Sequence, residues 1–153
     1  MRDEILAKIK AAGVRKKALP PLSPVQPKIK GDIEKHFIRE AQATGAEVKY
    51  LTDLDREVAF ISACFGIAET GTLVFTGKRA EIADIFLREE LDVLLKKKNI
   101  LSYQEQLWEA LNIADKNIPS SVILMSGPSR TGDIEQKIHI GAHGPKKITI
   151  FLD

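Results

Sequence analysis

The chain has 153 residues, the size of one ordinary domain, and folding at this length buries roughly two thirds of the unfolded chain's surface. Hydrophobic residues make up 44% of the sequence and charged residues 29%, a composition that excludes a disordered or collagen-like chain. Cys64 is the single cysteine, so this chain by itself cannot hold an iron–sulfur cluster, a structural zinc ion or an internal disulfide.

Residues 1–30 are predicted to form a basic, proline-rich arm ahead of an α/β domain at residues 31–153. The first 31 residues carry eight Lys/Arg and two acids, a net charge of +6, whereas the remainder carries 15 Lys/Arg and 19 acids, a net charge of −4. A short amphipathic helix at residues 2–12 precedes four prolines that favour an extended course, Pro20, Pro21, Pro24 and Pro27. The arm either packs loosely on its own domain or docks on an acidic partner or a second copy.

The distribution of charged and apolar residues also indicates which partners and which location to expect. We expect no nucleic-acid partner, because no aromatic residue lies among the arm's basic residues and the acidic body repels phosphates. We expect no membrane span, because no apolar run approaches the roughly 18 residues that a span requires. Charges occur throughout residues 1–17, unlike a secretory leader, which favours a cytoplasmic location.

The first half of the domain is predicted to contain two helical segments and several strands. Asp32 is the expected N-cap of a helix that ends before Gly45, with apolar residues at helical spacing, Ile33, Phe37, Ile38 and Ala41. A brief helical turn is expected at residues 80–87. Short runs rich in β-branched or aromatic residues predict strands at residues 46–51, 58–63, 72–76 and 91–95.

The second half of the domain is predicted to contain further helices and strands in alternation. Ser102 and Glu105 predict a capping box that opens a helix ending near Asp115, with an expected buried stripe of Leu107, Trp108 and Leu111. The uninterrupted apolar run in residues 121–125 predicts a strand covered on both faces, at the centre of a parallel sheet.

A loop at residues 126–133 should lead into a helix that ends near Ile140, then a Gly-His-Gly-Pro turn and a last strand at residues 147–152. Strands separated by helices predict an α/β fold with a mainly parallel sheet flanked by helices.

The loop at residues 126–133 is the most distinctive candidate binding segment. Glycines and free amides at a helix start, together with a guanidinium, suit a phosphate or carboxylate, which makes these residues candidate anion ligands: Ser129, Arg130, Thr131 and Asp133. Asp133 and Glu135 oppose an anion there, since they place negative charge at the same helix start. The structural alternative is a turn with Ser129 or Thr131 as N-cap and with Arg130 paired to Asp133 or Glu69.

Two further segments contain candidate catalytic groups. Glu69 lies among small and apolar neighbours, where a carboxylate can act as base or nucleophile, or alternatively accepts backbone hydrogen bonds in a tight turn. His143 lies in a glycine-flanked turn, where catalysis and turn-stabilising hydrogen bonding are both open. His139 and His143 have no third ligand close in sequence, so we predict no metal site.

Three motifs in order resemble the signature of the LutC/YkgG family, the LUD domain, over residues 58–153, and make this chain a short member. They are Ile67-Ala68-Glu69-Thr70-Gly71-Thr72-Leu73-Val74, then Ser126-Gly127-Pro128-Ser129-Arg130-Thr131-Gly132-Asp133-Ile134-Glu135, then Gly141-Ala142-His143-Gly144-Pro145. The residues that match family motif positions are Glu69, Thr70, Gly71, Ser129, Arg130, Asp133, Glu135, His143 and Gly144.

The resemblance implies a fold similar to ribose-phosphate isomerase, glucosamine-phosphate deaminase and CoA-transferase. It also implies an accessory, non-redox subunit in the oxidation of L-lactate to pyruvate, with no cofactor in this chain and iron–sulfur clusters in partner subunits. The three motifs would form a ligand or partner cleft for a small organic or phosphorylated acid. The alternatives are a CoA-transferase-like or sugar-phosphate-isomerase-like enzyme that uses Glu69, and a non-catalytic organic-acid-binding protein.

The sequence departs from the family pattern in two places. Gly132 stands where alanine is expected, which loosens the first helical turn by about 1 kcal/mol. Only a short link joins the strands expected to end at Leu51 and to begin at Val58, where family members have further helix and strand. We therefore expect homo-oligomerisation to offset the missing segment.

Overall fold

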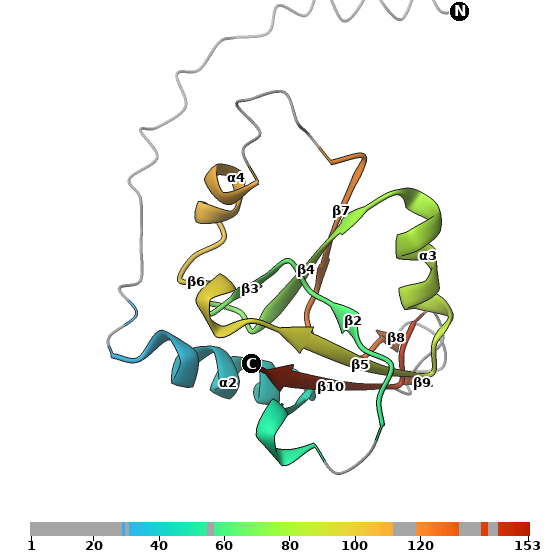
Figure 1. Cartoon of the computed structure of the whole chain (residues 1–153), viewed down its shortest axis with the longest axis horizontal. Coiled ribbons are helices and arrows are strands. Elements are labelled where there is room, and N and C mark those ends of the chain that lie inside the picture. Colours follow the sequence, from blue (N-terminus) through green and yellow to red (C-terminus); the bar gives the residue numbers. More distant parts are fainter. Residues whose placement is uncertain (1–28, 30, 55–56, 112–118, 132–138, 141–143) are drawn as a thin grey trace, which may run out of the picture.

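The computed structural model describes residues 29, 31–54, 57–111, 119–131, 139–140 and 144–153. In this part of the chain, one four-stranded sheet is entirely parallel. Its strands, in spatial order, are β1 (Glu47–Tyr50), β10 (Lys147–Leu152), β5 (Glu90–Leu95) and β2 (Ile61–Ser62). The prediction of an α/β fold with a mainly parallel sheet is confirmed (Figure 1).

The apolar pattern of the strands explains the position of this sheet. In β5 the buried residues alternate with half-buried or exposed ones, as expected of a strand with one face toward the core. In β10 every residue after Lys147 is buried, because β10 lies between β1 and β5. The expected strands at residues 46–51, 91–95 and 147–152 are confirmed, whereas only Ile61–Ser62 of the expected strand at residues 58–63 pairs.

A second four-stranded sheet, which the sequence did not predict, packs against the first. Its spatial order is β6 (Ile100–Leu101), β3 (Phe65–Ile67), β4 (Thr72–Gly77) and β7 (Ser121–Met125). β3 and β4 form an antiparallel hairpin, and β4 pairs antiparallel with β7. Buried residues between the two sheets form the main core, among them Leu73, Phe75, Val93 and Ile150.

The prediction that β7 is a central parallel strand covered on both faces is wrong. β7 is the edge strand of the second sheet, it runs antiparallel to β4, and Leu124 is 41% exposed. An apolar run of this length also fits an edge strand whose outer face is partly covered. Here that face contributes Val122 to a small cluster around Val74 and Leu107.

Helices α2 (Ile33–Ala43) and α3 (Arg79–Leu87) lie at different sides of the sheets in Figure 1. Asp32 caps α2 as predicted, because its Oδ1 accepts the Glu34 N–H at 3.0 Å, and the chain leaves the helix through Gly45 at φ +96°. The helix buries Phe37 and Ala41. The segment expected at residues 80–87 is confirmed as α3.

The predicted capping box before α4 (Gln106–Ala110) is replaced by a different bond pattern. Gln106 Oε1 accepts the N–H groups of Ser102 and Tyr103 at 2.8 and 3.1 Å, and Glu105 makes no side-chain cap. Leu107 is buried as predicted, but Trp108 is 51% exposed, because α4 covers the second sheet with one narrow face. The expected helix end near Asp115 lies outside the described residues.

The segment after β7 also differs from the prediction. Two short strands, β8 (Arg130–Thr131) and β9 (His139–Ile140), pair antiparallel, so the expected helix does not extend to Ile140 and Arg130 is not in an open loop. The expected arm helix at residues 2–12 lies outside the described part. Within that part, no helix is long and apolar enough to cross a membrane.

Candidate functional site

The first two sequence motifs meet through a chain of three hydroxyl groups. Thr72 Oγ1 lies 2.6 Å from Thr70 Oγ1 and 2.6 Å from Ser126 Oγ. Thr72 is 4% exposed, whereas Thr70 and Ser126 are exposed, so the chain leads from a buried centre to two accessible ends. The antiparallel register explains the contact: Leu73 pairs with Met125, which places the preceding Thr72 beside the following Ser126.

The second and third motifs are also in contact. The Ser129 N–H donates to the Pro145 carbonyl at 3.0 Å. A Cβ built on Gly144 would lie 3.3 Å from the Ser129 Cβ, so the two segments pass each other closely. The Ser129 amide is therefore engaged within the protein, and it is not the free helix-start amide that the sequence predicted.

Two motif glycines press against the C-terminal end of α2. Gly71 has φ +62° and Gly127 has φ +72°, conformations that favour glycine. A Cβ on Gly71 would collide with the backbone of Ala41, and a Cβ on Gly127 would collide with the carbonyl oxygen of Thr44. We call the assembly of residues 69–72 and 126–130 at this helix end, with residues 144–145 against Ser129, the motif junction.

Arg130 is the charged group that holds the motif junction to α2. Its Nη2 donates to the Thr44 carbonyl oxygen at 3.1 Å. Carbonyls at a helix C-terminus lack intrahelical partners and carry the negative end of the helix dipole, so a guanidinium binds there favourably. Among the described residues no ion pair links Arg130 to Glu69, and the structural alternative that paired these two is therefore not observed.

Glu69 lies in the hairpin turn between β3 and β4. Its backbone N–H donates to the Ser102 carbonyl at 3.1 Å, which fixes the turn against the segment before α4. The side chain is half-buried, and in the described part of the chain its carboxylate has no hydrogen-bond or ion-pair partner. The backbone-accepting role that the sequence left open for this carboxylate is thus not seen among these residues.

The structure places only some of the predicted site residues. It brings together Thr70, Gly71, Ser129 and Arg130, and it places Glu69 one residue from Thr70. Thr131 is positioned by its backbone in β8. Asp133, Glu135 and His143 lie outside the described residues. Over the residues that are described, no group of three metal-ligating side chains gathers.

Sequence reasoning missed three participants, Thr72, Ser126 and Thr44. The first two could have been found by pairing the strand at residues 72–76 antiparallel with the strand at residues 121–125. Thr44 is 86 residues from Arg130 in sequence, and no local pattern indicates that contact. The expectation that the second motif follows a strand of a parallel sheet was also wrong, since β7 belongs to the other sheet.

The fold of this chain is shared with a protein of solved structure. A crystal structure of a DUF162 family protein from Deinococcus radiodurans matches 78% of this chain and 95% of that chain with a TM-score of 0.56. The two sequences are 12% identical, so this likeness shows a common fold.

The family is defined by sequence. The LUD domain profile matches residues 9–152, and the chain belongs to the LUD domain family. Lactate utilization protein C of Anoxybacillus flavithermus is 36% identical over 87 residues, which are 56% of this chain and 39% of that protein. The uncharacterised protein YkgG of Escherichia coli is 34% identical over 100 residues, which are 63% of this chain and 43% of that protein. The chain thus spans less than half the length of these curated relatives, and the predicted family membership is confirmed.

Proposed function

We propose that this chain is an accessory, non-redox subunit in the oxidation of L-lactate to pyruvate, and that the motif junction binds a ligand or partner of that reaction. The observation that carries the proposal is the mutual contact of three sequence motifs, two of which pack against the C-terminal end of α2. Two hydroxyl contacts of 2.6 Å join the first motif to the second, and an amide bond of 3.0 Å joins the second to the third. The family relatives named lactate utilization protein C support the reaction class.

The hydroxyl chain gives the motif junction a way to recognise an anion. When Thr72 accepts from one neighbour and donates to the other, the two hydrogen bonds use two of the three hydroxyl protons. The remaining O–H is at an accessible end, on Thr70 or Ser126, and donates to an acceptor outside the chain. Arg130 adds a guanidinium with five donor N–H groups, of which Thr44 accepts one. A small organic or phosphorylated acid fits these donors.

Electron transfer must be performed by other subunits in this account. Converting lactate to pyruvate removes two electrons and two protons, and this chain has one cysteine with which to hold a redox centre. We propose, as the family resemblance implies, that iron–sulfur clusters are held by the partner subunits and that this chain holds no cofactor. Cys64 Sγ lies 3.1 Å from Thr76 Oγ1 and is a free thiol, which suits the cytoplasm.

The test is lactate-dependent dye reduction by the purified partner subunits, measured with and without this chain. The proposal predicts that the rate falls when the chain is omitted and returns when it is added back. Undiminished dye reduction without the chain would refute the accessory role.

A second candidate function, an enzyme that uses Glu69, is favoured by the unengaged carboxylate described above. In a CoA-transferase-like reaction, the Glu69 carboxylate attacks a thioester carbonyl, the CoA thiolate leaves, and a mixed anhydride forms on Glu69. In a sugar-phosphate-isomerase-like reaction the same carboxylate removes a proton. Mass spectrometry after incubation with acyl-CoA esters should find the adduct on native protein and not on Glu69→Gln. Ligand binding without any adduct or turnover favours a non-catalytic organic-acid-binding protein.

We also propose that the chain forms homo-oligomers through β7. Among the described strands β7 pairs on one side only, and its residues carry neither charge nor proline, the usual protections of an open edge. A second β7 placed antiparallel about Ile123 would set Val122 opposite Leu124, an apolar pair on the partly exposed face.

Light scattering at micromolar concentration tests this association. We expect an oligomer for the native chain and a monomer for Leu124→Lys. The matched control is Leu87→Lys on α3, at a position that is 81% exposed, and it should stay oligomeric. A strictly monomeric native chain would contradict the proposal.

A further inference from the structure

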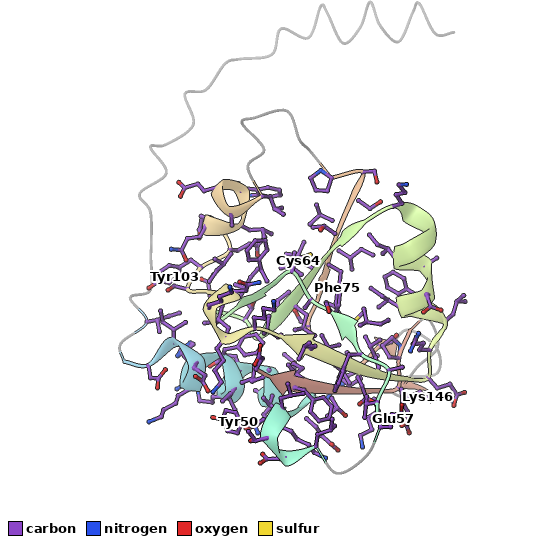
Figure 2. All side chains as sticks on the ribbon, viewed as in Figure 1. Tyr50, Glu57, Cys64, Phe75, Tyr103 and Lys146 are labelled. Atoms are coloured by element: carbon purple, nitrogen blue, oxygen red, sulfur yellow. The ribbon has the colours of Figure 1, made fainter. Side chains whose placement is uncertain are left out.

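A second group of chemically active side chains lies at the other end of β10 from the motif junction. Pro145, which belongs to the motif junction, precedes β10, whereas Leu152 ends it. Seven residues of extended chain separate these two points by roughly 20 Å. Figure 2 shows the separation, with Lys146 at one end of this strand and Tyr50 near the other. A ligand at this second place would therefore not touch the motif junction.

A cavity of about 300 Å³ opens at this end of the parallel sheet. Its lining residues all follow or end parallel strands, and they are Tyr50, Leu51, Thr52, Lys97, Leu152 and Asp153. In open α/β sheets, ligands bind outside the carboxyl ends of the strands. The volume is at the lower end of the range for small-molecule pockets. Position and size both favour a small organic ligand.

Lys97 is held in this cavity by two groups that a ligand could replace. Its Nζ lies 3.4 Å from Glu34 Oε1 and 4.5 Å from the centroid of the Tyr50 ring. The side chains of Lys97 and Glu34 are 41% and 27% exposed, so water reaches the pair and the ion pair is weak. The Tyr50 hydroxyl also bonds to Glu34, and that bond raises the pKa of Tyr50. Glu34 thus competes with a ligand for Lys97, the ammonium among the described residues that line the cavity.

We propose that this cavity binds a small monocarboxylic acid with an apolar body. The carboxylate replaces Glu34 as the partner of Lys97, and the apolar body lies against Leu51, which is half-buried. Asp153 also lines the cavity, and its negative charge repels a dianion such as phosphate more strongly than a monocarboxylate. The site is therefore distinct in place from the motif junction.

Amide-shift titration of the full chain with 4-methylpentanoate tests the site. We expect saturable shifts at Leu51, Thr52 and Asp153, without comparable shifts at residues 69–72. Lys97→Gln should weaken binding about tenfold, as expected for loss of a charge-assisted bond. The neighbouring Lys98→Gln is the matched control, since Lys98 is exposed and does not line the cavity, and it should bind as the native chain does.

A third variant is expected to strengthen binding rather than weaken it. Glu34→Gln removes the competing carboxylate, so 4-methylpentanoate should bind several-fold more tightly. Inorganic phosphate should leave the amides of Leu51, Thr52 and Asp153 unshifted. Absence of saturable shifts, equal affinity in Lys97→Gln and Lys98→Gln, or equal binding of phosphate would each overturn the proposal. These outcomes do not depend on the lactate reaction, so they are separable from failure of the proposed function.

Discussion

Replacing Gly71 by alanine should separate the hairpin turn from α2. Gly71 has φ +62°, a left-handed conformation that costs a residue with a Cβ about 1–2 kcal/mol. The new methyl group would also collide with the backbone of Ala41 and Glu40, which cannot rotate away as a side chain could. Such overpacking costs about 1–3 kcal/mol. We therefore expect Gly71→Ala to lower the free energy of unfolding by about 2–5 kcal/mol in total.

Gly31→Ala is the matched control for this measurement. Gly31 also has a positive φ, +103°, but nothing lies within 4 Å of a Cβ built there. The effect of alanine on the unfolded chain is the same in both variants and cancels between them. Urea unfolding should show Gly71→Ala to be less stable than Gly31→Ala by about 1–3 kcal/mol at similar slope. Equal midpoints for the two variants would refute the close contact between the hairpin turn and α2.

Three further predictions concern single side chains. Thr72→Val breaks both hydroxyl contacts and should lower the free energy of unfolding by about 1–3 kcal/mol. Thr72→Ser keeps the hydroxyl, so urea unfolding should show it to be more stable than Thr72→Val. The ammonium of Lys146, 2.8 Å away, lowers the pKa of Glu89, so the pair stabilises the fold above the ordinary glutamate pKa and this contribution disappears as the pH falls through the lowered value. Lys146→Gln should raise that pKa in an NMR titration. Glu34→Gln should lower the raised pKa of Tyr50, as tyrosinate absorbance would show; an unchanged titration would contradict the hydrogen bond.

The elements that sequence predicted well are those whose signals are local. The Asp32 cap and the Gly45 exit define α2 from its own residues, and the alternation of β5 is visible within six residues. The apolar run of β7 contained no information about its partner, because an uncharged run fits both a central parallel strand and an edge strand. Its antiparallel register with β4 depends on contacts between segments about 50 residues apart.

Individual residues of the candidate site were predicted, but their arrangement was not. Glu69, Ser129 and Arg130 were identified from their motifs, but their arrangement depends on α2, which contains none of the motifs. Arg130 was expected to meet a carboxylate and instead binds the Thr44 carbonyl, since a helix C-terminus attracts a guanidinium from any part of the sequence. The cavity beside Tyr50 was not predicted, because its lysine and its tyrosine lie far apart in the sequence.

The most direct test of the central claim is lactate-dependent dye reduction by the assembled subunits with a chain altered at the motif junction. The altered chain carries Thr72→Val and Ser126→Ala, and Gly31→Ala is the control that is destabilised away from the site. If the motif junction serves the reaction, the assembly with the double variant should reduce dye at least about tenfold more slowly, which corresponds to an activation free energy higher by about 1.4 kcal/mol or more. The assembly with the Gly31→Ala chain should reduce dye at a near-native rate. Equal rates for the double variant and the control would contradict the account.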